Sequence, residues 1–357
     1  MKFVHIADFH FDTSFSQIND SNLGVLRRTD QRKVLKKIID FIEEYNIECL
    51  FIAGDFYEHK YIKESTIEYI NNQFKRIENT QIFITPGNHD PYVKNSFYNK
   101  YTWNNNVHIF GPEISKYKLG DVNIYGCGFD DFYYSNPQIE NFEIENKNEV
   151  NIFITHGSLD GGYDDKRVYN PMSSSKMRQL GFDYVALGHI HKANYEEEKN
   201  IIYPGSTISM GFDELGKHGM IVGDISKGDL KIEFVPVDEA EFVVSNLDVS
   251  GLFTMEDVVT EISTMNINEN NYYEIYLVGK RNFDIDMYNL RKLIESPRII
   301  KVKDKTEINR DLNSLINENT LKGLYVKEIM ERLQNCGDDE QKVLEDALEI
   351  GLNILEK

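Results

Sequence analysis

Histidine, aspartate and asparagine residues stand at the ends of short apolar segments in this chain of 357 residues. The clearest case is DYVALGHIHK, residues 183–192, where an apolar run ends in Gly188, His189 and His191. Histidines two residues apart fill a core poorly, and a glycine before the first of them allows a sharp backbone turn. The segment therefore favours a loop that presents two imidazoles to one site.

Four other apolar segments end in the same kind of polar cluster. They are KFVHIADFH (2–10), CLFIAGD (49–55), QIFITPGNHD (81–90) and NIFITHG (151–157). Four of the five segment ends carry at least one of the nine histidines and the remaining one ends in Asp55, which chance does not readily produce. The polar residues collected in this way are Asp8, His10, Asp55, Asn88, His89, Asp90, His156, His189 and His191.

This mixture of carboxylate, amide and imidazole groups suits divalent manganese, iron or zinc. Calcium and thiolate zinc are disfavoured, because the set is neither all oxygen nor does it contain sulfur. The ligands outnumber what one ion with open positions needs, and a carboxylate such as Asp55 can bridge two ions. Two ions about 3.5–4 Å apart can share a hydroxide that attacks phosphorus while both take up the developing charge. The residue types thus predict two-metal hydrolysis of a phosphoester.

Strands and helices must position these side chains. Short segments rich in Ile, Val and Phe are typical of buried strands. Residues 34–42 and 65–77, which separate the first three segments, repeat apolar side chains at helical spacing, with Ser65 and Glu68 in capping-box positions. The alternation predicts a layered α/β domain, in which ligands bind beyond the carboxyl ends of strands. The polar clusters are all placed there.

A change in sequence pattern near Ala240 suggests further domains. We predict a catalytic domain at 1–238, a small β-α-β-α-β domain at 239–307 and a helical C-terminal region at 308–357. The last helix carries an apolar stripe that either packs on the chain's own domains or docks a partner. The stripe consists of Leu344, Ala347, Leu348, Gly351, Leu352 and Leu355.

The composition limits the partners and the cellular compartment. The formal net charge is −20, so a nucleic acid would have to bind at a local positive site or at a metal. Arg27 and Arg28 open the main basic cluster and could lie near substrate phosphates, whereas a solvated helix face explains the rest of that cluster. Three widely spaced cysteines, no room for a signal peptide before Lys2 and no membrane-length apolar run predict a cytoplasmic protein.

The motifs DFH, GD, GNHD, THG and GHIH, in this order, resemble the five signatures of the calcineurin-like metallophosphoesterases over about the first 235 residues. Within that superfamily the chain most resembles the SbcD-type DNA repair nucleases, with a YhaO-like exonuclease branch closest. The N-terminal start of the first motif, the YPGS segment from Tyr203 to Ser206 and the β-α-β-α-β pattern support this resemblance. It implies a layered β-sandwich core flanked by helices, a small capping domain and a helical C-terminal tail.

The resemblance also implies roles for the residues. The family binds two divalent ions, and Mn2+ is the expected metal. By resemblance, the first ion would be held by Asp8, His10 and His191 and the second by Asn88, His156 and His189. Asp55 would bridge the two ions. His89 would stabilise the transition state or protonate the leaving oxygen, and Asp90 would orient His89. The expected partners are DNA, a coiled-coil ABC-type ATPase and a second copy of the chain.

One departure from the family pattern bears on the substrate. The nucleases commonly have histidine three residues after the bridging aspartate, whereas this chain has Glu58 there and His59 one residue later. The first hypothesis is a metal-dependent DNA exonuclease or endonuclease that acts in repair with the ATPase. The second is a phosphodiesterase or phosphatase for small phosphoesters. The third, a non-catalytic scaffold of the same fold, ranks below both because all seven expected ligands and His89 are present.

Overall fold

The computed structural model describes residues 1–15, 21–133, 139–161, 169–195 and 199–355. The chain divides into two compact units, each described by itself below. The first unit comprises Met1–Val244 and Ile267–Glu274, and the second comprises Ser245–Asn266 and Ile275–Lys357.

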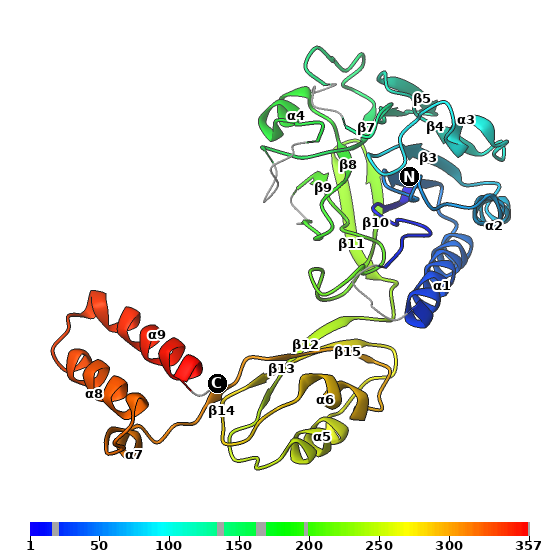
Figure 1. The fold of residues 1–357 in the computed structure, drawn as a ribbon. Helices are drawn as coiled ribbons and strands as arrows, with labels where there is room; N and C mark the ends of the chain where they lie inside the picture. Colours follow the sequence, from blue (N-terminus) through cyan, green and yellow to red (C-terminus); the bar gives the residue numbers. More distant parts are fainter. Residues whose placement is uncertain (16–20, 134–138, 162–168, 196–198, 356–357) are drawn as a thin grey trace. The chain divides into compact units, whose positions relative to one another are not determined.

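Two β-sheets form the centre of the first unit (Figure 1). The six-stranded sheet has the order β11-β10-β1-β2-β3-β4. The strands β1 to β4 are parallel to one another, and β10 is antiparallel to both of its neighbours, β1 and β11. Its strands are β1 (Lys2–Ile6), β2 (Cys49–Ala53), β3 (Gln81–Thr85), β4 (Val107–Ile109), β10 (Gly219–Ser226) and β11 (Asp229–Pro236). The five-stranded sheet has the order β5-β6-β7-β8-β9 and is parallel from β6 to β9. Its strands are β5 (Ser115–Leu119), β6 (Val122–Gly126), β7 (Val150–His156), β8 (Tyr184–Gly188) and β9 (Ile201–Ile202).

Side chains that alternate along the strands build two separate cores. In β2, Leu50 and Ile52 pack with the helix layer, whereas Phe51 packs with the second sheet. This period of two follows from strand geometry, because successive side chains point to opposite faces. Both faces of the parallel strands are therefore apolar, as the continuous Ile, Val and Phe runs predict.

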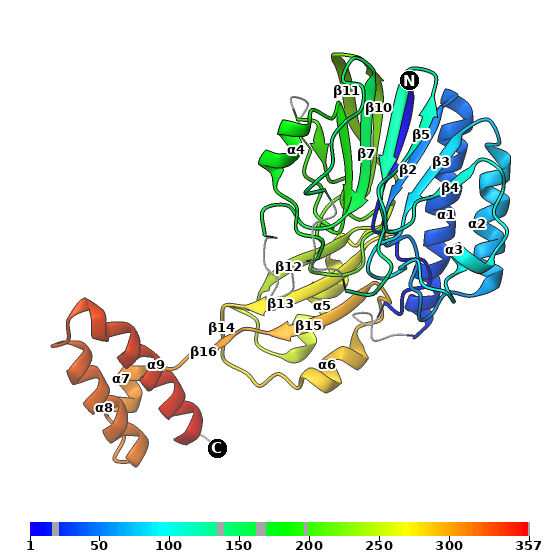
Figure 2. The ribbon, with the colours of Figure 1, turned by 90° about the horizontal axis from the view of Figure 1, so that it is seen from above.

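Helices cover the outer faces of both sheets (Figure 2). The six-stranded sheet is covered by α1 (Ser21–Tyr45) and α2 (Glu64–Arg76), with the short α3 (Phe97–Lys100) beside them. The helix α4 (Ser174–Leu180) packs Met177 and Leu180 against Phe153 and Val185 of the other sheet. The predicted layered β-sandwich core flanked by helices is confirmed, and the five predicted strands are β1, β2, β3, β7 and β8.

The start of α2 differs from the sequence prediction. The helix begins at Glu64 with Lys63 as its N-cap, so Ser65 lies inside the first turn and forms no capping box. The carboxylate of Asp12, from the loop after β1, accepts hydrogen bonds from the Lys63 amide (3.4 Å) and the Thr66 hydroxyl (2.6 Å). The cap thus comes from a residue distant in the sequence, which a local motif cannot reveal.

The second unit contains a small mixed portion followed by helices. The three-stranded sheet has the order β12-β13-β15, and the boundary between the units falls within β12 and β13. A two-stranded sheet pairs β14 with β16. The elements are β12 (Phe242–Asp248), α5 (Met255–Thr264), β13 (Tyr272–Val278), β14 (Lys280–Arg281), α6 (Met287–Leu293), β15 (Ile299–Asp304), β16 (Glu307–Ile308), α7 (Leu312–Ile316), α8 (Leu321–Leu333) and α9 (Asp338–Leu355). These units do not separate the segments 239–307 and 308–357, so the domain boundaries remain predictions.

The C-terminal helices have a small core of their own. Leu348 and Leu352 of α9 pack with Val326 and Ile329 of α8 and with Leu315 of α7. Leu348 and Leu352 of the predicted apolar stripe therefore pack against other helices of the second unit. Among the residues described, no helix combines the length and the apolar character that crossing a membrane needs.

Candidate metal centre

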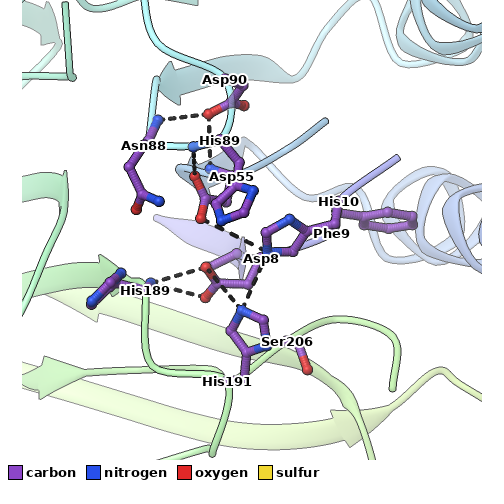
Figure 3. A network of polar contacts seen from close by, with 12 residues as sticks. Asp8, Phe9, His10, Asp55, Asn88, His89, Asp90, His189, His191 and Ser206 are labelled. Carbon is purple, nitrogen blue, oxygen red and sulfur yellow. Dashed lines mark hydrogen bonds and ion pairs between the residues drawn. The ribbon is translucent and has the colours of Figure 1, made fainter. Parts of the chain in front are cut away.

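The loops after β1, β2, β3 and β8 meet at one edge of the sandwich (Figure 3). His156, the last residue of β7, joins them there. Several of their polar residues have positive φ angles: 50° at Asp8, 49° at His10, 50° at Asp55 and 103° at His189. Residues other than glycine adopt this region at a cost of about 1–3 kcal/mol each, and such strain clusters at functional sites. The sharp turns therefore lower the stability of the fold somewhat, and they direct these side chains toward one site.

Backbone hydrogen bonds join the loops to one another. The amide of His10 donates to the Asp55 carbonyl (2.9 Å), and the amide of Asp8 donates to the Gly54 carbonyl (3.1 Å). The amide of His89 donates to the Asp55 carboxylate at 2.8 Å. Because each loop is bound to its neighbour, the relative positions of the side chains are set by the backbone.

One group of converging ligand atoms consists of Asp8, His10 and His191, whose ligand atoms lie within 4.8 Å of one another. The two Nε2 atoms of His10 and His191 are 3.2 Å apart. The Nδ1 atom of His191 donates to Glu214 at 2.5 Å, and that of His10 donates to Glu58 at 2.9 Å. A carboxylate on the outer nitrogen fixes the tautomer and directs the other nitrogen's lone pair inward, as in metal-bound histidine.

A second group consists of Asp8, Asp55 and His156, all buried. His156 Nδ1 donates to the Ala53 carbonyl at 3.0 Å, which leaves Nε2 facing the site. That Nε2 atom lies 3.3 Å from Asp55 Oδ2 and 3.1 Å from Asn88 Oδ1. Asp55 Oδ2 is also 3.8 Å from His10 Nε2, so this carboxylate lies between the two groups.

His189 has a different relation to the site. Its backbone amide donates to both carboxylate oxygens of Asp8 at 3.0 Å. Its ring lies edge-on to that of His156, with the centroids 5.2 Å apart. Among the described residues, its ring nitrogens join no group of three converging acidic, histidine or cysteine ligands. The backbone of His189 therefore positions Asp8, and the ring stands at the border of the second group.

The electrostatics of the cluster favour a bound cation. Burial raises the pKa of Asp8. Burial acts to lower the pKa of His156, but the charge of Asp55 and the hydrogen bond to it outweigh burial and raise the pKa to about 9. Buried carboxylates need positive charge beside them. A mixed set of carboxylate, amide and inward-facing imidazole groups fits divalent transition-metal ions.

Asp90 is the residue that is predicted to orient His89. Its buried carboxylate accepts hydrogen bonds from the Tyr98 hydroxyl at 2.6 Å and from four backbone amides. These amides belong to Asp55 (3.0 Å), Phe56 (2.7 Å), Tyr57 (3.4 Å) and Gly87 (2.7 Å). Asp90 therefore ties the loop after β2 to the loop after β3.

The ring of His89 is bound by another carboxylate. Its Nδ1 atom donates to Glu58 Oε2 at 3.1 Å, and its side chain is exposed at the rim of the site. Burial would lower the pKa of His89, but the hydrogen bond to Glu58 and nearby negative charges raise it to about 9. The carboxylate of Asp90 binds Tyr98 and backbone amides that need an acceptor, and its charge is one of those that raise the pKa of His89, so its orienting role stays a prediction.

The prediction that Arg27 lies near substrate phosphates is wrong. Arg27 is fully buried, forms an ion pair with Asp238 and donates to the Ser209 carbonyl at 2.9 Å. A buried arginine needs such partners, so its position in α1 serves packing and not substrate binding. Arg28 is half-buried and makes a long hydrogen bond of 3.5 Å to the Thr13 carbonyl.

Glu214 is a site residue that the sequence analysis missed. It binds His191 and also accepts a hydrogen bond from the Ser206 hydroxyl at 2.9 Å. Burial acts to raise the pKa of Glu214, but the hydrogen bond from His191 and the charge of that ring outweigh burial and lower the pKa. Glu214 lies 23 residues from His191 in an acidic chain, so no local spacing singles it out.

Comparisons with known proteins agree with this arrangement. The family model described as calcineurin-like phosphoesterase matches residues 1–193. The chain is 26% identical over 264 residues to the uncharacterized metallophosphoesterase YhaO of Bacillus subtilis, covering 70% of this chain and 64% of that protein. The match thus spans slightly less than two thirds of this relative's length.

Two further proteins are similar to the chain. The SbcD subunit of the nuclease SbcCD of Staphylococcus epidermidis is 27% identical over 331 residues, covering 82% of this chain and 83% of that protein. The crystal structure of TT1561 of Thermus thermophilus has a TM-score of 0.39 and 10% identity, covering 65% of this chain and 98% of that one.

Proposed function

The chain belongs to the calcineurin-like phosphoesterases and is a metal-dependent phosphoesterase, and we propose that its substrate is DNA. In this proposal the enzyme cleaves phosphodiester bonds as an exonuclease or endonuclease. The observation that carries it is the convergence of five side chains, from three loops and the end of β7, into two groups of ligand atoms. They are Asp8, His10, Asp55, His156 and His191. The similarity to a protein named as a nuclease subunit over 82% of the chain supports DNA as the substrate.

We assign the metal ligands as follows. Asp8, His10 and His191 would hold one ion, Asn88 and His156 would hold the other with His189 beside them, and Asp55 would serve both. When bound, two divalent cations, which we propose to be Mn2+, supply an activated hydroxide and neutralise charge on the phosphate. The carbonyl of Ala53 and the carboxylate of Glu214 keep the ligating nitrogens of His156 and His191 directed inward.

His89 is the proposed proton donor to the leaving oxygen. Its ring is exposed at the rim, with its centroid 4.7 Å from that of His10, so a phosphate at the metal centre would contact it. Its Nδ1 atom is engaged by Glu58, which leaves Nε2 for the substrate. General acids of this kind contribute roughly 100- to 10,000-fold to the rate.

Small phosphoesters are the second candidate substrate. The buried position of Arg27 removes one of the two arginines expected to bind phosphates, and the net charge of −20 disfavours a polyanion. A small diester needs fewer contacts outside the metal centre than a DNA strand does. This candidate uses the same ligands and the same chemistry.

We further propose that α9 docks a coiled-coil ABC-type ATPase and that the enzyme works with it in DNA repair. Val343, Ile350 and Ile354 are 66%, 60% and 66% exposed, whereas Leu352 on the other side of α9 is 1% exposed. Spacings of seven and four residues place the three exposed side chains on one stripe, the pattern that coiled coils bury. A homodimer is proposed as well, and light scattering of the purified chain measures it.

The test of the proposed function uses purified protein loaded with Mn2+. Linear DNA labelled at its ends should be shortened or nicked, and His89→Ala should abolish this while metal content stays constant. His108→Ala is the matched control, because His108 binds Gln81 at 2.8 Å in the six-stranded sheet, outside the proposed site. Hydrolysis of a chromogenic diester but not of any DNA substrate would favour the second candidate, and hydrolysis of neither would contradict the proposal.

A further inference from the structure

Glu58 makes two hydrogen bonds at the edge of the metal centre. Its Oε1 atom accepts from His10 Nδ1 at 2.9 Å, and its Oε2 atom accepts from His89 Nδ1 at 3.1 Å. Its side chain is only 15% exposed. One carboxylate therefore joins a proposed metal ligand to the proposed proton donor.

The backbone places residue 58 between these histidines. The amide of Glu58 donates to the Phe11 carbonyl at 3.0 Å, in the loop after β1. The amide of the next residue, His59, donates to the His89 carbonyl at 3.0 Å, in the loop after β3. Since the loop after β2 is bound to both neighbours, the position of residue 58 does not depend on its side chain alone.

The two rings are not arranged to bind each other. Their planes lie at 84° with centroids 4.7 Å apart, so the ring of one faces an edge of the other. Both Nδ1 atoms must therefore find an external acceptor, and the two oxygens of Glu58 provide one each. With the proton held on Nδ1, His10 keeps its Nε2 lone pair for the group formed with Asp8 and His191.

We propose that Glu58 is a positioning residue that sets the tautomer and orientation of His10 and His89 together. The proposal rests on the proposed function for the role of His89, whereas the shared hydrogen bonding stands independently. Glu58, His10 and His89 also form a converging group that could be read as a further cation site. That reading would require His10 to give both ring nitrogens to cations, which a neutral imidazole cannot do.

The test compares Glu58→Gln with Glu68→Gln, which removes the same charge from the exposed face of α2. A glutamine keeps the shape but has an NH2 donor in place of one of the two acceptor oxygens, so one histidine loses its acceptor. We expect Glu58→Gln to lower kcat for a chromogenic diester at saturating Mn2+ about 10- to 100-fold with KM unchanged, and to weaken metal affinity through His10. Glu68→Gln should change neither. In a His89→Ala background, Glu58→Gln should cause a smaller further loss of kcat than it does in the wild type, because only its effect through His10 is left.

A readout independent of activity completes the experiment. In metal-free protein labelled with ¹⁵N-histidine, the Nδ1–H signals of both His10 and His89 should be protected in the wild type, and at least one should be lost in Glu58→Gln. Retention of both signals, an unchanged kcat, or a full additional loss in the His89→Ala background would each overturn the proposal. Unchanged metal affinity in Glu58→Gln would confine its effect to His89 and overturn the shared role. If the wild type hydrolyses no phosphoester, the proposed function fails while the NMR signals still decide whether Glu58 holds both rings.

Discussion

Replacement of Gly54 by alanine should disturb the metal centre without changing any ligand. Gly54 precedes Asp55 and has a φ of +84°, and a Cβ atom added there would lie 2.3 Å from His156 Nδ1. Real Cβ contacts are essentially never below 3.0 Å, so the imidazole must move away. This movement would break the 3.0 Å hydrogen bond from Nδ1 to the Ala53 carbonyl that fixes the ring.

The magnitude has two parts that a control variant separates. A non-glycine residue in the left-handed region costs about 1–2 kcal/mol, and overpacking a rigid site costs about 1–3 kcal/mol more. Gly181, after α4, has a φ of +82° but no atom within 4 Å of an added Cβ. Gly181→Ala should therefore show only the backbone cost, and Gly54→Ala should be less stable than it by about 1–3 kcal/mol.

Two measurements check this reasoning. Urea unfolding of both variants in chelator gives the difference in free energy of unfolding, and elemental analysis after reloading gives the metal content. Gly54→Ala should retain less than two ions per chain and should lose most phosphodiester hydrolysis, whereas Gly181→Ala should retain both. Equal stability of the two variants, together with full metal content in Gly54→Ala, would refute the assigned position of His156.

The remaining predictions concern burial, ligand orientation and metal removal. Arg27→Met leaves the charge of Asp238 buried without its cation and should lower the free energy of unfolding by about 3–5 kcal/mol. Thermal unfolding measures this effect, and an unchanged melting temperature would contradict the buried ion pair. Glu214→Gln removes the carboxylate that orients His191 and should weaken metal affinity about 10- to 100-fold, so an unaltered metal titration would argue against that role. Removal of the metal with a chelator should abolish hydrolysis. It should also lower the melting temperature, because the ions bind only the folded protein, and added Mn2+ should restore both the activity and the melting temperature. Full activity of the metal-free enzyme would exclude the metal-centre assignment.

Much of the site could be predicted because its residues follow strands. Asp8, His156 and His191 each follow a run of buried apolar residues, and parallel strands carry such residues to the same edge. The contacts of Asp90 and Arg27 could not be predicted in this way. Both are polar residues near a predicted ligand loop, yet backbone amides surround Asp90 and Asp238 neutralises Arg27.

The sequence by itself determined the fold class, the order of the strands that carry ligands and the chemical type of the ligand set. These properties depend on local patterns of apolar residues and on the side chains at each strand end. Only the tertiary structure decided which carboxylate binds which histidine. Glu58 and Glu214 lie 48 and 23 residues from the ring nitrogens of His10 and His191 that they bind, and each is one of many acidic residues in a chain with a net charge of −20. Hydrogen-bond partners are selected by distances of about 3 Å that arise only when the loops pack together.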